Sequence, residues 1–187
     1  MIKRFHYNSP VILTYTLLSF IALLLGSFTN YYSTRLLFSV YRGSLTDVFF
    51  YFRLFGHVLG HADWNHYLSN FLIILIIGPM LEEKYGSKNL LIMMAITAFM
   101  TGLLNILLFD SALLGASGIV FMFILLGSFA NIKKGKIPIT LVLVVIVYLG
   151  NELADAFLKD DNVSQLTHIA GGIFGCIFGF TRHTGRG

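Results

Sequence analysis

Six long apolar stretches, joined by short polar segments, make up most of this chain. About 20 apolar residues in a helix are enough to cross the roughly 30 Å hydrocarbon core of a bilayer. Hydrophobic residues account for 56% of the 187 residues and charged residues for only 12%, too few to cover a soluble domain of this size. The sequence therefore predicts an all-α, polytopic membrane protein with six transmembrane helices, at Val11–Phe28, His57–Leu81, Leu90–Phe109, Ser117–Ala130, Ile137–Phe157 and Leu166–Phe180.

The distribution of lysine and arginine predicts the orientation of these helices, because cytoplasmic loops carry an excess of both. With a cytoplasmic N-terminus, nine of these residues fall on the cytoplasmic side and four on the other, namely Arg35, Arg42, Arg53 and Lys159. Both termini are then cytoplasmic. Ser117 and His168 begin the fourth and sixth stretches at their outer ends, so the two polar residues enter the membrane from the same side.

The remaining charge and cysteine content excludes two other classes of protein. The net charge is +4, but the basic residues are spread over several loops rather than gathered in one stripe, so we expect no nucleic-acid partner. Cys176 is the only cysteine and lies in an apolar run, so there is no disulfide framework. The lipid bilayer is the partner that the composition predicts.

A serine between glycines, in Gly115-Ala116-Ser117-Gly118, opens the fourth stretch. Polar side chains are costly in lipid, and those retained there usually face a cavity and have a function. The stretch gives only about 21 Å of helix, which is shorter than the hydrocarbon core. We therefore expect the segment before Ser117 to dip inward as a loop, and Ser117 to lie at a helix N-terminus in a water-accessible depression. Free backbone N–H groups at such an end suit an oxyanion.

The outer half of the second stretch carries four further polar residues, His57, His61, His66 and Asn70. Residues four apart share a helix face, which predicts the pairs His57 with His61 and His66 with Asn70. Histidines at this spacing can bind zinc, but the glutamate of an HExxH motif is absent. A zinc site at His57 and His61 and histidines bonded to backbone in an unusual turn remain alternatives. His66 and Asn70 are predicted to be side-chain donors beside Ser117.

Together these motifs resemble those of the rhomboid family of intramembrane serine proteases. The family's G-x-S-G matches residues 115–118, and its H-x-x-G-x-x-x-G matches His168, Gly171 and Gly175. Its H-x4-H-x3-N matches His61, His66 and Asn70. Glu82 matches an acidic residue after the second helix, and Arg53 matches the arginine of a Trp-Arg pair that here reads Phe52-Arg53. The resemblance extends over the six-helix core.

The resemblance implies a fold and an activity. It implies a single rhomboid-type six-helix domain over residues 1–187, with no appended soluble domain, no cofactor and no metal. Ser117 would be the nucleophile and His168 the general base in hydrolysis of peptide bonds in or beside transmembrane segments of substrate proteins. The oxyanion would be stabilised by His66, Asn70 and the backbone N–H of Ser117. The supporting residues would be Gly115, Gly118, Phe121, His61, Gly171, Gly175, Arg53 and Glu82.

The sixth stretch also carries a stripe of glycines, Gly171, Gly175 and Gly179, spaced by four. Such a stripe lets another helix backbone approach closely. We expect the partner to be the fourth helix, which carries Gly118, because that approach would bring His168 to the Ser117 hydroxyl. Phe121, four residues after Ser117, stands where relatives often have a tyrosine and offers an aromatic face to His168.

Two other functions are open to a chain of this kind. One is a catalytically inactive rhomboid-like protein that binds transmembrane helices without cutting them. The other is a small transporter or channel in which the intramembrane histidines relay protons, which would predict repeated or broken helices in the two halves of the chain. The small size and the absence of a transit peptide favour a bacterial plasma membrane, with the active site open to the extracytoplasmic side.

Overall fold

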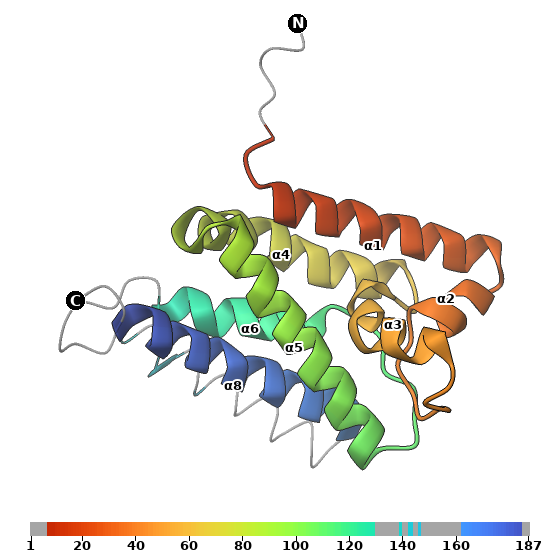
Figure 1. Cartoon of the computed structure of the whole chain (residues 1–187). Coiled ribbons are helices and arrows are strands. Elements are labelled where there is room, and N and C mark those ends of the chain that lie inside the picture. Colours follow the sequence, from red (N-terminus) through yellow and green to blue (C-terminus); the bar gives the residue numbers. More distant parts are fainter. Residues whose placement is uncertain (1–6, 130–138, 140–141, 144–145, 147–161, 185–187) are drawn as a thin grey trace, which may run out of the picture.

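The computed structural model describes residues 7–129, 139, 142–143, 146 and 162–184, and in the last helix the side chains of residues 166–181 (Figure 1). This part of the chain is all-α. Its helices are α1 (Pro10–Phe28), α2 (Tyr32–Leu37), α3 (Val48–Gly56), the 3-10 helix η2 (His57–Leu59), α4 (Trp64–Tyr85), α5 (Ser87–Leu108), α6 (Ser117–Ser128) and α8 (Asn162–Thr184). Three of them, α1, α4 and α5, are long and apolar enough to cross a membrane. The prediction of an all-α protein with membrane-length helices is confirmed; the predicted fifth stretch, Ile137–Phe157, lies almost wholly outside the described residues.

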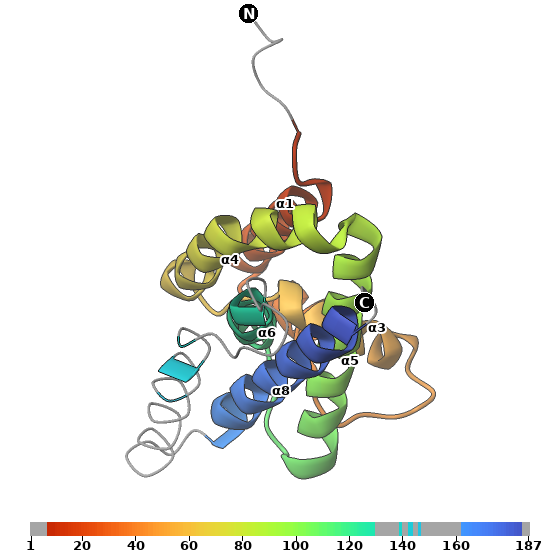
Figure 2. The same cartoon turned by 90° about the vertical axis from the view of Figure 1, so that its left-hand side faces the viewer.

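Helix α6 occupies the centre of the fold, in contact with α4, α5 and α8 (Figures 1 and 2). Most of its side chains are buried, and Ile119, Met122, Phe123 and Leu126 have no exposed surface, while the face with Phe121 and Ile124 is half-buried. A helix that is apolar all round belongs in a core. With 12 residues, α6 is about 18 Å long, so it is shorter than the predicted fourth stretch.

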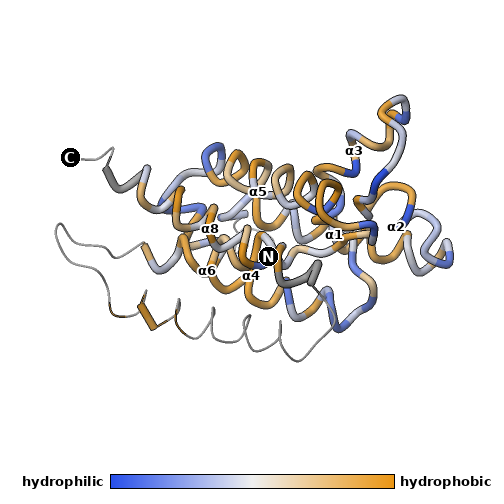
Figure 3. Tube along the Cα trace, turned by 90° about the horizontal axis from the view of Figure 1, so that it is seen from below, coloured by the Kyte–Doolittle hydropathy of each residue, from blue (hydrophilic) through white to orange (hydrophobic). Residues whose placement is uncertain are grey.

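Apolar side chains also cover much of the outer surface of the helices. Figure 3 shows apolar residues along the helices, while the most hydrophilic residues concentrate in loops and at helix ends. Many large apolar side chains of α1, α4 and α5 are exposed, including Leu17, Leu72 and Leu91. This pattern suits helices whose outer faces contact lipid rather than water.

The second predicted stretch is broken in the structure, and the prediction that His57 and His61 share a helix face is wrong. His57 lies in η2, whereas His61 lies in the connection between η2 and α4. Gly60 has an extended backbone that ends η2, and the Asp63 carboxylate accepts the N–H of His66 at 2.8 Å and so caps a new helix at Trp64. A single apolar stretch therefore contains two separate helices, η2 and α4.

The last helix starts earlier than predicted. It begins at Asn162 rather than Leu166, so His168 lies in its second turn and not at its start. Residues 163–165 are Val, Ser and Gln, and no Gly or Pro among them interrupts the helix. Helices α2 and α3, between the first and second apolar stretches, were not predicted. Asp47 begins α3 by accepting the N–H of Phe49 at 2.9 Å.

Glu82, near the end of α4, caps the start of α1. Its two carboxylate oxygens accept the backbone N–H groups of Val11 and Ile12 at 3.0 and 3.1 Å, and Oε1 also accepts the hydroxyl of Ser87 at 2.7 Å. The first N–H groups of a helix have no partner within the helix, and a negative charge at this end is favourable. Glu82 is 4% exposed, so it holds α1, α4 and the start of α5 together from within the protein.

We expect Glu82→Gln to destabilise the fold by about 1–3 kcal/mol, because one amide oxygen replaces two charged acceptors and leaves a buried N–H without its partner. The measurement is SDS-induced unfolding in mixed micelles. Glu83→Gln is the matched control, since Glu83 is exposed on the next position of the same helix. Equal unfolding midpoints for the two variants would contradict a structural role for the Glu82 carboxylate.

Candidate active site

A cavity of about 560 Å³ opens beside the N-terminal end of α6. Its lining comes from the first turns of α4, the loop that precedes α6, α6 itself and α8. The cavity is lined by Ala62, His66, Ser69, Asn70, Ile73, Ser111, Ala112, Leu113, Leu114, Ser117, Val120, Phe121 and His168. Five residues that the sequence singled out, Ser117, His168, His66, Asn70 and Phe121, are therefore brought together from three helices.

Ser117 is the first residue of α6, as predicted, and Ala116 is the N-cap. The preceding residue, Gly115, has φ +124°, a conformation that side chains rarely adopt. A Cβ at Gly115 would stand 2.7 Å from Nε2 of His66, so the imidazole lies against the glycine. This close approach requires glycine and places His66 beside the turn that leads into Ser117.

The loop before Ser117 is attached to the segment between α2 and α3. Val40 and Leu113 exchange two backbone hydrogen bonds of 2.9 Å as an isolated antiparallel bridge. Asn105, at the end of α5, donates to the carbonyls of Val40 at 3.2 Å and Ser111 at 3.0 Å. The buried amide of Asn105 thus joins both segments, which makes the loop a fixed part of the fold.

Arg42 holds the other end of the same loop. Its guanidinium donates to the carbonyls of Ile106 at 2.6 Å and Leu107 at 3.0 Å and forms an ion pair with Asp110. Carbonyls in the last turn of a helix have no partner within the helix, and a cation there is favourable. Sequence reasoning assigned no role to Arg42 or Asn105; Asn105, a polar residue inside an apolar stretch, was the available signal.

Two histidines contact the residues immediately before Ser117. The carbonyl of His57 accepts the N–H of Gly115 at 3.0 Å, and Nε2 of His61 accepts the N–H of Ala116 at 3.4 Å. The ring of His57 is itself bonded, with Nδ1 3.2 Å from the carbonyl of Arg53 and Nε2 3.3 Å from the hydroxyl of Thr101. Both histidines are 1% exposed. Of the alternatives open from the sequence, these contacts correspond to histidines bonded in an unusual turn.

Across the residues that the structure describes, no three His, Cys, Asp or Glu side chains are grouped as a metal ion would need. The ring nitrogens of His57 and His61 are used for hydrogen bonds instead. The zinc alternative therefore has no third ligand among the described residues, and the nearby Asp63 carboxylate accepts the backbone N–H of His66.

His66 and Asn70 lie one turn apart at the start of α4. Nδ2 of Asn70 donates to the carbonyl of His66 at 2.8 Å. An amide nitrogen carries two hydrogens, so this bond orients the Asn70 side chain and leaves a second N–H for another acceptor. The His66 ring packs edge-on against His61, with ring centroids 4.9 Å apart. Both side chains line the cavity in fixed positions.

Helix α8 brings His168 to the cavity by packing directly on α6. A Cβ on Gly171 would overlap the carbonyl of Gly118, and one on Gly175 would lie 2.5 Å from the carbonyl of Met122. The prediction that the glycine stripe contacts the helix carrying Gly118 is confirmed. Contacts advance in the same direction along both helices, so α6 and α8 are parallel, and the N-terminal end of α6 lies beside Thr167 and Gly171 of α8 (Figure 1).

Phe121 stacks on His168, with ring centroids 4.3 Å apart and planes inclined by 42°. The aromatic face predicted at this position therefore contacts the imidazole. Gly118 packs where three helices meet, since a Cβ there would lie 3.2 Å from Thr167 and 3.3 Å from Thr101. The small residues around Ser117 are what allow α5, α6 and α8 to converge on it.

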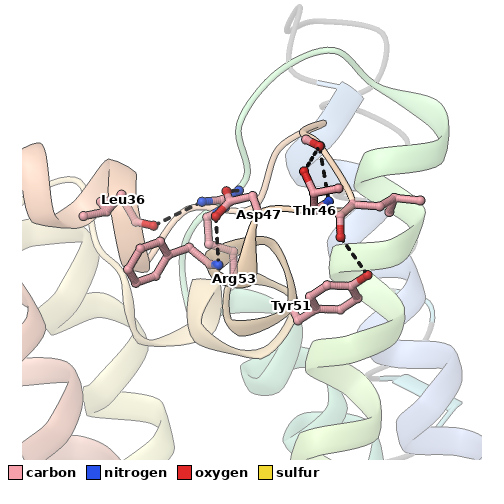
Figure 4. A network of polar contacts seen from close by, with 8 residues as sticks. Leu36, Thr46, Asp47, Tyr51 and Arg53 are labelled. Atoms are coloured by element: carbon pink, nitrogen blue, oxygen red, sulfur yellow. Dashed lines mark hydrogen bonds and ion pairs between the residues drawn. The ribbon is translucent and has the colours of Figure 1, made fainter.

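Arg53 does not line the cavity. It is 2% exposed, and its guanidinium donates to the Asp47 carboxylate at 2.8 Å and to the carbonyl of Leu36 at 3.3 Å (Figure 4). It also lies over the ring of Tyr41, 4.4 Å from the centroid. The arginine thus organises the segment from α2 to α3, the same segment whose Val40 pairs with the loop before Ser117. Arg53 and Glu82 therefore hold helices and loops in place and do not themselves line the cavity.

The ion pair with Arg53 makes stability depend on pH. The hydrogen bond from Arg53 holds the pKa of Asp47 below its ordinary value. A lowered carboxyl pKa stabilises the fold above the unfolded pKa of about 4, and this contribution is lost as the pH falls through the folded pKa. We expect the melting temperature of the wild type to fall more steeply from pH 5 to pH 3 than that of Asp47→Asn. Glu83→Gln is the control, and parallel curves for wild type and Asp47→Asn would contradict the coupling.

A family model described as the Rhomboid domain matches residues 49–185, which is more than half of the chain. The match begins within α3 and covers α4, α5, α6 and α8, and so includes every residue of the cavity. Helix α1 precedes it. No curated protein sequence matches the chain.

Proposed function

The chain belongs to the rhomboid family, and we propose that it is an intramembrane serine endopeptidase. It would hydrolyse peptide bonds in or next to the transmembrane segments of membrane proteins. The observation that carries this proposal is the shared cavity of Ser117 and His168, one at the N-terminal end of α6 and the other on the adjacent, parallel α8. A serine and a histidine in one cavity are the minimum pair for a nucleophile and its base.

In the proposed reaction, Oγ of Ser117 attacks the carbonyl carbon of the scissile bond while His168 takes the hydroxyl proton. The carbonyl oxygen becomes an oxyanion, which the backbone N–H of Ser117, His66 and the free amide hydrogen of Asn70 would stabilise. His168 then gives its proton to the leaving amine as the C–N bond breaks. Water hydrolyses the resulting ester by the same steps, and Ser117 is regenerated. No cofactor enters the scheme.

We propose that six helices cross the membrane, with both termini in the cytoplasm and the cavity open to the extracytoplasmic side of a bacterial plasma membrane. The three membrane-length helices and the shorter apolar segments Ser117–Ser128 and Leu166–Thr181 are compatible with five of these helices, and the remaining one, Ile137–Phe157, lies almost wholly outside the described residues. Because α6 is about 18 Å long in a hydrocarbon layer of about 30 Å, Ser117 would lie below the surface, where water can enter through the cavity. Substrates would be transmembrane proteins reaching that depth.

The test is to purify the full chain in detergent, return it to liposomes and add a single-span substrate protein. We expect cleavage near the outer boundary of the substrate's span, identified by mass spectrometry, and covalent labelling of Ser117 by a fluorophosphonate. A folded wild type that captures transmembrane helices but neither cuts them nor reacts with the fluorophosphonate would instead be an inactive rhomboid-like binder.

Gly115→Ala should lower kcat by roughly two to three orders of magnitude, the typical cost of losing one oxyanion donor. The added methyl group would stand 2.7 Å from Nε2 of His66 and would place alanine at φ +124°, so it must displace the imidazole or the turn. The measurement is the turnover of the single-span substrate. Gly43→Ala is the control, because Gly43 is an exposed loop glycine where a Cβ would meet Arg53 at an ordinary 3.4 Å. Unchanged turnover in Gly115→Ala would exclude His66 from the oxyanion site.

A further inference from the structure

A fully buried serine on α1 lies close to the residues that precede the proposed nucleophile. Ser19 is 0% exposed, in the middle of an apolar helix. Its hydroxyl donates to the carbonyl of Leu59 at 2.8 Å and lies 3.2 Å from Nδ1 of His61. A polar side chain inside a membrane helix is usually kept for the partner it meets, and here Leu59 ends η2 while His61 lies in the connection from η2 to α4.

The donors and acceptors around His61 fix its tautomer. A backbone N–H can only donate, so Nε2 of His61, 3.4 Å from the nitrogen of Ala116, must be an acceptor. A neutral imidazole has one donor and one acceptor nitrogen, which places the proton on Nδ1. The Ser19 hydroxyl already donates to Leu59, so it accepts the hydrogen of Nδ1, which also lies 3.3 Å from the carbonyl of Leu59. The result is a continuous hydrogen-bond chain from Ala116 through His61 and Ser19 to the carbonyl of Leu59.

Packing against neighbouring rings also fixes the orientation of the His61 imidazole. Three rings pack against it, those of His66, Tyr67 and Phe71, with centroids 4.9, 5.5 and 5.6 Å away. The ring is 1% exposed and cannot turn without moving these neighbours. With the ring plane set by packing, the remaining choice is which nitrogen carries the proton, and both the Ser19 hydroxyl and the carbonyl of Leu59 favour Nδ1.

We propose that Ser19 is a positioning residue: by keeping the proton of His61 on Nδ1, it keeps Nε2 free to hold the N–H of Ala116 and so sets the turn that presents Ser117. The role rests on the proposed protease function. Ala116 is 0% exposed and is the N-cap of α6, so a shift of its N–H moves both the hydroxyl and the backbone N–H of Ser117. Ser19 lies outside residues 49–185, and the family match assigns it no role.

The kinetic test compares Ser19→Ala with Thr97→Val in the full chain. Thr97 is the matched control, because it is also 0% exposed but its hydroxyl donates to the carbonyl of Met93 in its own helix. We expect Ser19→Ala to lower kcat about tenfold with KM within twofold, since misplaced reacting groups reduce the rate without weakening substrate binding. Thr97→Val should change both by less than twofold. Equal kcat values in the two variants, or a change in KM alone, would overturn the proposal.

A second measurement reports the tautomer of His61 and needs no substrate. Nitrogen-15 NMR of histidine-labelled protein in micelles distinguishes the two tautomers, and the His61 signals are assigned by their loss in His61→Gln. We expect the Nδ1–H form in the wild type and a weaker preference for it in Ser19→Ala. The Nε2–H form in an active wild type would overturn the proposal alone. The Nδ1–H form in a protein with no hydrolase activity would support the hydrogen-bond chain and contradict the proposed protease function.

Discussion

Ser117→Ala and His168→Ala should each abolish cleavage of a transmembrane substrate, and the double variant should be no slower than either single one. The two side chains would act in the same proton-transfer step, so removing one leaves the other without a function. In soluble serine proteases, losing the nucleophile or the base lowers kcat by roughly six orders of magnitude. Additive losses in the double variant would indicate that the two residues act in separate steps.

The measurement combines cleavage of the single-span substrate with fluorophosphonate labelling. Labelling should be absent in Ser117→Ala and slow in His168→Ala, because the serine remains but its base is gone. Cys176→Ala is the control on the same helix as His168, since Cys176 does not line the cavity. Cleavage that survives Ser117→Ala would mean that a different residue is the nucleophile.

Sequence periodicity predicted the helices whose ends are marked by local signals. Pro10 starts α1 one residue before the predicted position, and Ser117 starts α6 where the G-x-S-G motif placed it. Helix α4 runs to Tyr85, past the predicted end at Leu81, and stops at Gly86, which has φ +80°. Proline fixes φ and glycine permits positive φ, so their effect on helix boundaries is readable without tertiary contacts.

The break at Gly60–Asp63 was the main failure of the sequence-based prediction. The stretch is apolar enough to read as one helix, and hydropathy alone does not detect a change of direction inside it. A local signal did exist: Asp63 precedes Trp64 as an N-cap residue, and Gly60 lies three residues before it. The break is what turns His57 and His61 toward the loop before Ser117 rather than onto one helix face.

The contacts that hold this loop could not be predicted from the sequence. Val40 pairs with Leu113, Asn105 joins their two segments, and Ser19 reaches His61, each across more than 40 positions in the chain. Such pairs leave no periodic pattern, because each depends on how distant helices pack. The motifs predicted which side chains surround the cavity, whereas the structure shows which backbone groups keep them there.

Gly171→Ala should destabilise the protein by about 1–3 kcal/mol and lower turnover by roughly 100-fold, and Gly171→Val should do more of both. A Cβ at Gly171 would overlap the carbonyl of Gly118, which belongs to backbone and cannot turn away as a flexible side chain could. Helix α8 must then move off α6, and His168 moves with it. The defect is one of spacing between the helices, so a larger side chain has a larger effect.

The measurement is SDS-induced unfolding in mixed micelles, together with fluorophosphonate labelling of the fraction that remains folded. Gly127→Ala adds the same methyl group to α6, where a Cβ would lie 3.5 Å from Ile77 at ordinary contact distance. That variant should be as active as the wild type and more stable by up to about 1 kcal/mol, because alanine favours the helix over glycine. If Gly171→Ala matched Gly127→Ala in both measurements, the close contact of α6 and α8 would not be what aligns His168 with Ser117. Slow labelling of the folded fraction of Gly171→Ala, in contrast, would show that the added methyl group misaligns His168 and Ser117 even where the fold is intact.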